Sequence, residues 1–146
     1  MTRTLAEILL FASLAMNAAL LLFIAGVLRK MMDEMDESAF KLFVVSLVRH
    51  SKKSPFMLTL LNIPFLGAIP YCYFYGFANR WLIAGLAVWL VAGIIGKTMK
   101  LPVYKAIEVG DAVQVREARR KLNTGNMLQA ILNSVAALLA AVPFVR

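Results

Sequence analysis

The sequence predicts an all-α, polytopic membrane protein whose four transmembrane helices form an antiparallel bundle. Four apolar runs are each long enough to cross a bilayer core of roughly 30 Å, which takes about 20 helical residues. The composition agrees, because 61% of the 146 residues are hydrophobic and the mean hydropathy is +0.74. A soluble domain of this size carries more charge, since most of a small globule is surface. We expect one transmembrane domain over residues 1–146.

The first predicted transmembrane helix spans Leu5–Leu28, with Glu7 as its one charged residue. This run is longer than the apolar region of a typical signal peptide. It is closed by Arg29 and Lys30 rather than by a small-residue cleavage site. We therefore predict a retained helix.

A polar segment, 29–54, follows the first helix. Its acidic residues between Asp33 and Glu37 suit the start of a helix, where negative charge is favoured. Apolar residues then recur at helical spacing, which predicts an amphipathic helix over Glu37–Arg49. It is too short to span the bilayer, so we place it along the membrane surface or against the bundle. A simple packed connector is the alternative.

The second and third helices are predicted over residues 55–75 and 81–99, joined by the tight turn Gly76–Arg80. A short turn makes them an antiparallel pair. Pro64 and Pro70 lie inside the second run, so a kink or break is expected there. Tyrosines and phenylalanines gather at its far end and indicate an interfacial aromatic belt. The alternative is a stacking site for an aromatic ligand.

Glycines recur along the third run, at Gly85, Gly93 and Gly96. Small residues let transmembrane helices approach closely in lipid, so these positions predict close packing. Pro102 should end or kink the helix just beyond the membrane.

A second basic segment, 100–125, precedes the last transmembrane helix. Gly110 followed by Asp111 indicates a break and an N-cap. We expect a short helix over 112–123 and then the fourth transmembrane helix over 126–142.

The distribution of positive charge predicts the orientation. Thirteen of the sixteen lysines and arginines lie in or beside the two long polar segments. By the positive-inside rule, both segments are expected to be cytoplasmic and both termini to lie outside the cytoplasm. We expect the basic surface to meet anionic lipid head groups rather than nucleic acid, because no recognition motif accompanies it. The expected lipid contacts are Arg116, Arg119, Arg120 and Lys121.

Ionisable residues are missing from the deep parts of the four runs, which argues against a proton pump, a proton-coupled transporter or a voltage sensor. His50 is the single histidine and Cys72 the single cysteine, so one chain cannot supply a bis-histidine haem site, a multi-histidine zinc site or an internal disulfide. We predict no metal, no cofactor and no catalytic residue.

Amide and hydroxyl side chains remain as candidates for binding. In the last helix Asn126, Gln129 and Asn133 are spaced by three and four residues and therefore share one face. Asn17 and Asn133 should face the bundle interior, because an unsatisfied amide in hydrocarbon is costly. These groups either bond neighbouring helices together or form a neutral polar pocket. The candidate pocket residues are Asn17, Asn62, Tyr71, Asn126, Gln129 and Asn133.

One stretch resembles a known family. Lys100-Leu101-Pro102-Val103-Tyr104-Lys105 is similar to the Asn-x-Pro-x-Asn element of the anthrone-oxygenase-like family of small four-helix bacterial membrane proteins. The basic run Arg116–Lys121 and the arginine-ended first helix fit the same layout. The resemblance implies the four-helix fold, a bacterial inner membrane and a hydrophobic aromatic substrate.

The sequence departs from that family at polar positions. Lys100 and Tyr104 stand where the family tends to have asparagines. Leu122, Asn126 and Gln129 align with its tryptophan, histidine and arginine near the start of the fourth helix. The resemblance therefore supports the family's fold for this chain more than the family's activity, because activity depends on the residues of the site.

Three functional classes follow. We favour a non-catalytic accessory or scaffold subunit that binds a membrane-protein partner. A small membrane enzyme acting on a hydrophobic aromatic substrate is the second class. A channel or carrier for a small solute, built as a homo-oligomer, is the third. A filled bundle interior would favour the subunit. An open cavity of a few hundred Å³ beside the amides of the last helix would favour the enzyme. A water-filled path through an oligomer would favour the channel or carrier.

Overall fold

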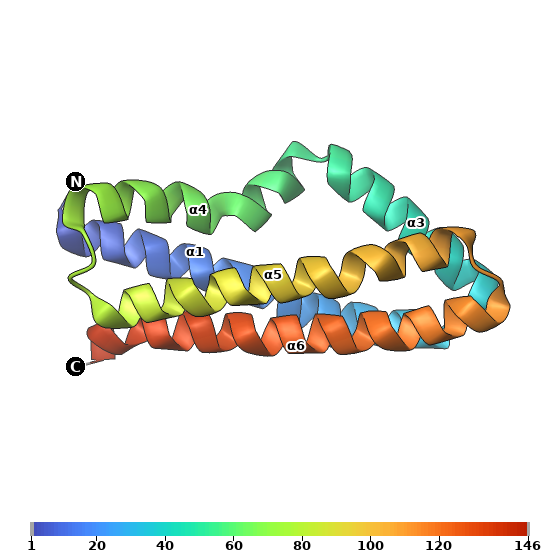
Figure 1. Ribbon diagram of the computed structural model, residues 1–146. Coiled ribbons are helices and arrows are strands. Elements are labelled where there is room, and N and C mark those ends of the chain that lie inside the picture. The colour runs from blue at the N-terminus through green and yellow to red at the C-terminus, as the bar shows by residue number, and fades with distance from the viewer. Residues whose placement is uncertain (1, 146) are drawn as a thin grey trace.

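The computed structural model describes residues 2–145, and helices make up almost all of this range (Figure 1). The elements are α1 (Arg3–Phe23), the π-helix η1 (Ile24–Leu28), α2 (Arg29–Glu34), α3 (Glu37–Lys53), α4 (Pro55–Tyr75), α5 (Arg80–Val109) and α6 (Ala112–Val145). Four helical stretches are long and apolar enough to span a membrane: Arg3–Glu34, Pro55–Tyr75, Arg80–Val109 and Ala112–Val145. The predicted all-α membrane fold is confirmed.

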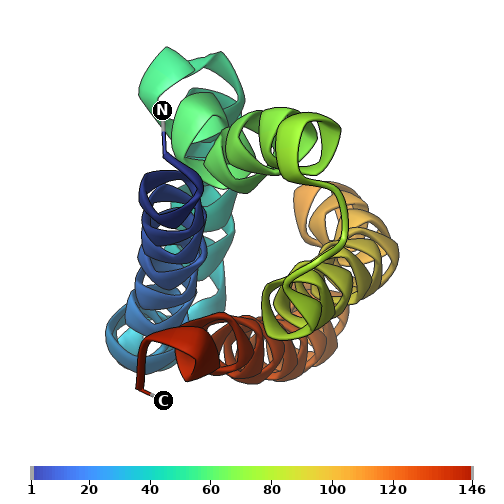
Figure 2. The same cartoon turned by 90° about the vertical axis from the view of Figure 1, so that its left-hand side faces the viewer.

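The four long stretches alternate in direction, so the bundle is antiparallel as predicted. Both chain ends and the turn between α4 and α5 lie at one end of the bundle, and the α5–α6 connection lies at the other (Figure 1). Viewed along the bundle, α1, α4, α5 and α6 form its four corners (Figure 2). Asn79 begins α5 as its N-cap, and its side chain accepts from the backbone N–H of Leu82 at 3.2 Å.

Small residues allow α5 and α6 to approach closely at the end of the bundle where α5 begins. A Cβ on Gly85 would lie 2.6 Å from the backbone oxygen of Ala136 and 3.3 Å from the Cβ of Ala140. Only glycine fits such an approach, which confirms the predicted close packing at this position. α4, by contrast, packs mainly against α1. The core at the end with the termini contains Ala6, Leu10, Leu14, Tyr71, Leu82, Leu86, Trp89, Ala136 and Ala140.

Helix lengths divide the molecule into a membrane part and a projecting part. At 1.5 Å per residue, the 21 residues of α4 match the bilayer core, whereas the 34 residues of α6 extend roughly 20 Å further. We call the projecting part the head region; it comprises α2, α3, residues 101–109 of α5 and residues 112–125 of α6. Its own core contains Met32, Phe40, Val44, Val103, Ile107, Val115, Ala118 and Leu122.

The amphipathic helix α3 packs against the projecting helices, which is the second of the two placements that the sequence allowed. It buries Phe40 and Val44 in the head region. Asp36 caps its first turn by accepting from the Ala39 N–H at 2.8 Å. Glu37 then pairs with Arg116 of α6 at 2.7 Å, which ties the start of α3 to the bundle.

Three of the four spans run further than the sequence predicted, whereas α4 has the predicted bounds 55–75. The first passes through a π-helical turn at Ile24–Leu28 and continues as α2 to Glu34, supported by an Arg29–Asp33 pair at 3.5 Å. Beyond it, residues 112–123 and 126–142 belong to one helix, α6, without the expected interruption. Gly125 lies inside this helix and is buried under the aliphatic stem of Lys100.

Pro102 does not end α5, which continues seven residues beyond it to Val109. A proline removes one backbone hydrogen bond, here to the carbonyl of Thr98. Burial of Val103 and Ile107 against the head region offsets this loss. Residues 100–125 are therefore mostly two packed helical extensions joined by a short turn, rather than a separate polar segment. Pro64 and Pro70 likewise lie within a continuous α4.

Candidate functional site

An open cavity of about 500 Å³ lies among all four long helices, and we call it the amide cleft. α1 and α6 contribute its polar floor, and α4 and α5 contribute most of its apolar walls. Its lining residues are Asn17, Leu21, Leu61, Asn62, Phe65, Trp89, Leu90, Gly93, Ile94, Lys97, Gln129 and Asn133. Four of the six predicted pocket residues, Asn17, Asn62, Gln129 and Asn133, thus lie together.

The exposure of the lining residues shows where the cleft opens. Asn17 and Asn133 are 3% and 2% exposed, so both face the interior as predicted. Leu61 on α4 and Ile94 on α5 are 41% and 64% exposed. The cleft therefore opens between α4 and α5, on a surface that the hydrocarbon of a bilayer covers.

Asn133 carries the most unusual polar atom of the cleft. Its Nδ2 donates to the backbone oxygen of Gln129 at 2.7 Å. Its Oδ1 is buried and has no hydrogen-bond partner in the part of the chain that the structure describes. A buried acceptor without a donor costs about 1–3 kcal/mol. A ligand or water that donates a hydrogen bond to this oxygen removes that cost.

Asn62, the cleft amide on α4, differs from Asn133 in its surroundings. Asn62 is exposed, and its Nδ2 donates to the backbone oxygen of Leu58, one turn earlier in the same helix, at 2.7 Å. Nearby, the rings of Phe65 and Trp89 meet edge to face with their centroids 4.5 Å apart. These two rings give the cleft an aromatic wall.

Lys100 is a residue of this region that the sequence reasoning missed. Its Nζ donates to Oε1 of Gln129, and its stem passes over Gly125. A Cβ on Gly96 would overlap the Gln129 side chain, so this glycine makes room for the amide. From the sequence, Lys100 contributed to the predicted orientation and to the family resemblance, and it was not among the predicted pocket residues. The signal available was its spacing of four residues from Gly96, which places both on one helical face.

Tyr71 and Asn126 do not line the cleft. The Tyr71 hydroxyl donates to Oε1 of Glu7 at 3.0 Å, at the end of the bundle that holds the chain ends. Glu7 also accepts from Nε of Arg3 at 3.0 Å. Asn126 is buried in α6 outside the cleft lining. The Arg3–Glu7 spacing of four residues was the available signal for this second polar cluster.

The four predicted lipid-contact residues have several protein partners. Arg116 pairs with Glu37, and Lys121 pairs with Glu117 at 2.7 Å. The Arg119 guanidinium lies 4.3 Å from the centroid of the Phe40 ring. Arg120 forms no ion pair within residues 2–145. Lipid contact by this group stays a prediction.

No family model matches the sequence, and neither the characterised proteins nor the solved structures compared with it give a match. The anthrone-oxygenase-like resemblance therefore remains a prediction.

Proposed function

We propose that this membrane protein binds a hydrophobic small molecule carrying a hydroxyl or N–H group, and that the molecule enters the amide cleft from the bilayer. The observation that carries the proposal is the buried Oδ1 of Asn133, a residue of the cleft lining, because this acceptor has no hydrogen-bond donor within residues 2–145. A hydroxyl on the ligand supplies the missing donor.

The size and walls of the cleft indicate the class of ligand. Its volume of about 500 Å³ lies within the range of about 300–1,000 Å³ that is usual for small-molecule sites. The Phe65–Trp89 wall favours a flat aromatic ring. A lipid-soluble phenol combines both features, and a hydrophobic aromatic molecule is also what the family resemblance implies.

We assign binding, rather than a reaction, to the cleft amides. Asn17, Gln129 and Asn133 can hydrogen-bond a ligand and orient it, but amides do not act as acids or bases near neutral pH. The ligand expected in the open cleft is a hydrophobic aromatic molecule, as in the second functional class, the small membrane enzyme. Any reaction of the bound molecule would be carried out by another component.

A subunit or scaffold role is the second proposal, and the outer face of α4 favours it. α4 packs mainly against α1, and its outward side chains Phe56, Leu66 and Ile69 are 74%, 64% and 68% exposed. Lipid covers this face in an isolated chain, and a partner helix or a second copy would cover it in an assembly.

The test of ligand binding compares 1-naphthol with naphthalene, which lacks the hydroxyl. Protein in nanodiscs, with Trp81→Phe so that fluorescence reports on Trp89, should bind naphthol about fivefold more tightly after correction for partitioning into lipid. One additional neutral hydrogen bond of about 1 kcal/mol gives this factor.

The matched variants are Asn133→Leu and Asn62→Leu. Asn133→Leu should abolish the preference for naphthol, because it removes the unpartnered oxygen. Asn62→Leu should retain the preference, because that amide is already bonded within its own helix. Equal affinity for both compounds in the parent protein, or an equal loss of preference in both variants, would contradict the proposal.

A further inference from the structure

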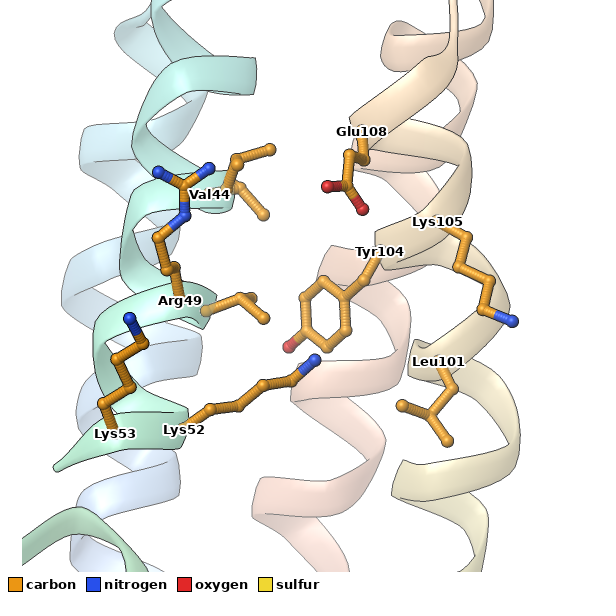
Figure 3. A pocket seen from close by; sticks show the side chains of 10 residues that line it. Val44, Arg49, Lys52, Lys53, Leu101, Tyr104, Lys105 and Glu108 are labelled. Atoms are coloured by element: carbon orange, nitrogen blue, oxygen red, sulfur yellow. The ribbon is translucent and has the colours of Figure 1, made fainter. Parts of the chain in front are cut away.

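A second cavity, separate from the amide cleft, lies between α3 and α5 in the head region (Figure 3). Its volume is about 360 Å³. We call it the basic cavity. The lining residues are Val44, Val45, Val48, Arg49, Lys52 and Lys53 from α3, and Leu101, Tyr104, Lys105 and Glu108 from α5.

The charges of this cavity are not neutralised by the protein. Arg49, Lys52, Lys53 and Lys105 are positive and Glu108 is negative, which leaves a net charge of +3. None of these five residues forms an ion pair within the described chain. The ion pairs found in the described chain instead involve residues outside this cavity. Several unpaired cations around one cavity favour an anionic occupant.

One polar side chain from each helix approaches the other beside an apolar wall. Lys52 extends from α3 toward the Tyr104 ring on α5, and the Tyr104 hydroxyl lies close to the end of the Lys52 side chain in the view of Figure 3. That hydroxyl forms no hydrogen bond to any residue from 2 to 145. Val48 and Leu101 supply apolar surface beside these groups. The cavity therefore combines hydrogen-bond donors for an anion with a surface for hydrocarbon.

The position along the chain places the cavity at the membrane surface. α3 ends at Lys53 and α4 enters the apolar span at Pro55, two residues later. On α5, Leu101 of the basic cavity follows Lys97 of the amide cleft by four residues, a rise of about 6 Å on the same helical face. Lipid head groups lie at this level, just outside the hydrocarbon.

We propose that the basic cavity binds the phosphate of an anionic phospholipid. Arg49 and Lys52 contact the phosphate, and the Tyr104 hydroxyl donates a hydrogen bond to it. The glycerol head group of phosphatidylglycerol fits the remaining polar group, because its hydroxyls can donate to Glu108. The acyl chains follow Val48 and Leu101 toward the bilayer. This site does not depend on ligand binding in the amide cleft.

Native mass spectrometry of the full chain in detergent, titrated with phosphatidylglycerol or phosphatidylcholine, tests the proposal. The protein should retain one phosphatidylglycerol in preference to phosphatidylcholine. Arg49→Gln with Lys52→Gln should weaken that binding about 30-fold, the effect of removing two cations beside an anionic group. The matched control, Lys30→Gln with Arg80→Gln, also removes one arginine and one lysine from exposed positions outside this cavity and should change binding less than about threefold.

Two further experiments test the hydrogen bond from Tyr104 and distinguish a bound lipid from a bound phosphate group alone. Tyr104→Phe should weaken binding about fivefold through one lost hydrogen bond. Glycerol 3-phosphate, added at the lipid's concentration, should leave the lipid bound, because it lacks acyl chains. Equal losses in the two double variants, no preference over phosphatidylcholine, or displacement by glycerol 3-phosphate would each overturn the proposal. Circular dichroism confirms that every variant keeps its helices.

Discussion

Asn133 and Asn62 are the same residue type in the same cleft, yet their surroundings give them different roles. Asn62 is exposed, and its Nδ2 donates to a backbone oxygen of its own helix. Exposure to lipid therefore costs this amide little free energy. Asn133 is buried, its Nδ2 donates to the Gln129 backbone, and its Oδ1 has no partner within residues 2–145. Helical spacing and depth in the sequence predicted the burial of Asn17 and Asn133. The spacing could not predict the free acceptor, because that depends on which neighbours the other helices supply.

Tyr71 shows the opposite case at the residue scale. Its aromatic, hydroxyl-bearing side chain suggested a pocket residue, but its hydroxyl bonds to Glu7, 64 positions earlier. The pairing depends on how α1 and α4 align along the bundle. A single sequence predicts that both helices exist, but it does not give their relative positions along the bundle axis.

Two glycines of α5 give a matched stability prediction. Gly85→Ala should lower the free energy of unfolding by about 1–3 kcal/mol, because the new Cβ would meet the Ala136 backbone, which cannot move aside. Gly93→Ala should be neutral or stabilising by up to about 1 kcal/mol, because nothing lies within 4 Å of its Cβ position and alanine favours helix. Unfolding in mixed micelles with increasing SDS measures both, and equal losses would contradict the close approach of α5 and α6.

At the scale of elements, the existence and order of the four spans were predictable because apolar length is a direct signal. The ends of α4 were predicted as well, whereas the other three spans extend beyond their predicted ends. Pro102 and Gly125 are local signals for a break, and both lie inside continuous helices. Packing of α5 against α6 and α3 in the head region outweighs the local preference, and such packing involves residues distant in sequence.

The docking of α3 should depend on pH through its two first-turn carboxylates. The Arg116 guanidinium bonds to Glu37 and lowers the pKa of that carboxyl. The Ala39 N–H at the N-cap lowers the pKa of Asp36. A carboxyl with a lowered folded-state pKa stabilises the fold above its unfolded pKa of about 4. That contribution is lost as the pH falls through the lowered value.

Hydrogen exchange of the α3 amides should therefore show full protection between pH 7 and about 5 and reduced protection below about 4, after correction for intrinsic rates. Glu37→Gln should weaken protection already at pH 7 and flatten its pH dependence. Glu34→Gln is the control, since Glu34 forms no ion pair within the described residues. Unchanged α3 protection from pH 7 to 3 in the parent protein would show that these carboxylates do not hold the helix.

At the scale of the whole molecule, the antiparallel order puts both termini and the α4–α5 turn at one end and the basic head region near the other (Figure 1). The excess of positive charge leads us to propose that the head region is cytoplasmic and that the termini lie outside. A bacterial inner membrane stays a prediction of the family resemblance.

Single cysteines in a Cys72→Ala background test this orientation. A membrane-impermeant maleimide applied to intact cells should label Ala78→Cys in the α4–α5 turn and leave Lys53→Cys at the end of α3 unlabelled. Both positions are exposed, so access depends on the membrane side. Labelling of residue 53 alone would reverse the proposed orientation.

The central claim is that a hydrophobic molecule with a hydroxyl enters the amide cleft between α4 and α5, and photo-crosslinking with a diazirine-bearing phenol tests it most directly. Peptide mapping by mass spectrometry should place the label on cleft residues such as Phe65, Leu90 and Ile94, and excess 1-naphthol should suppress it. Label confined to the outward residues Leu66 and Ile69, unaffected by naphthol, would show that the probe stays in the surrounding lipid and would contradict the claim.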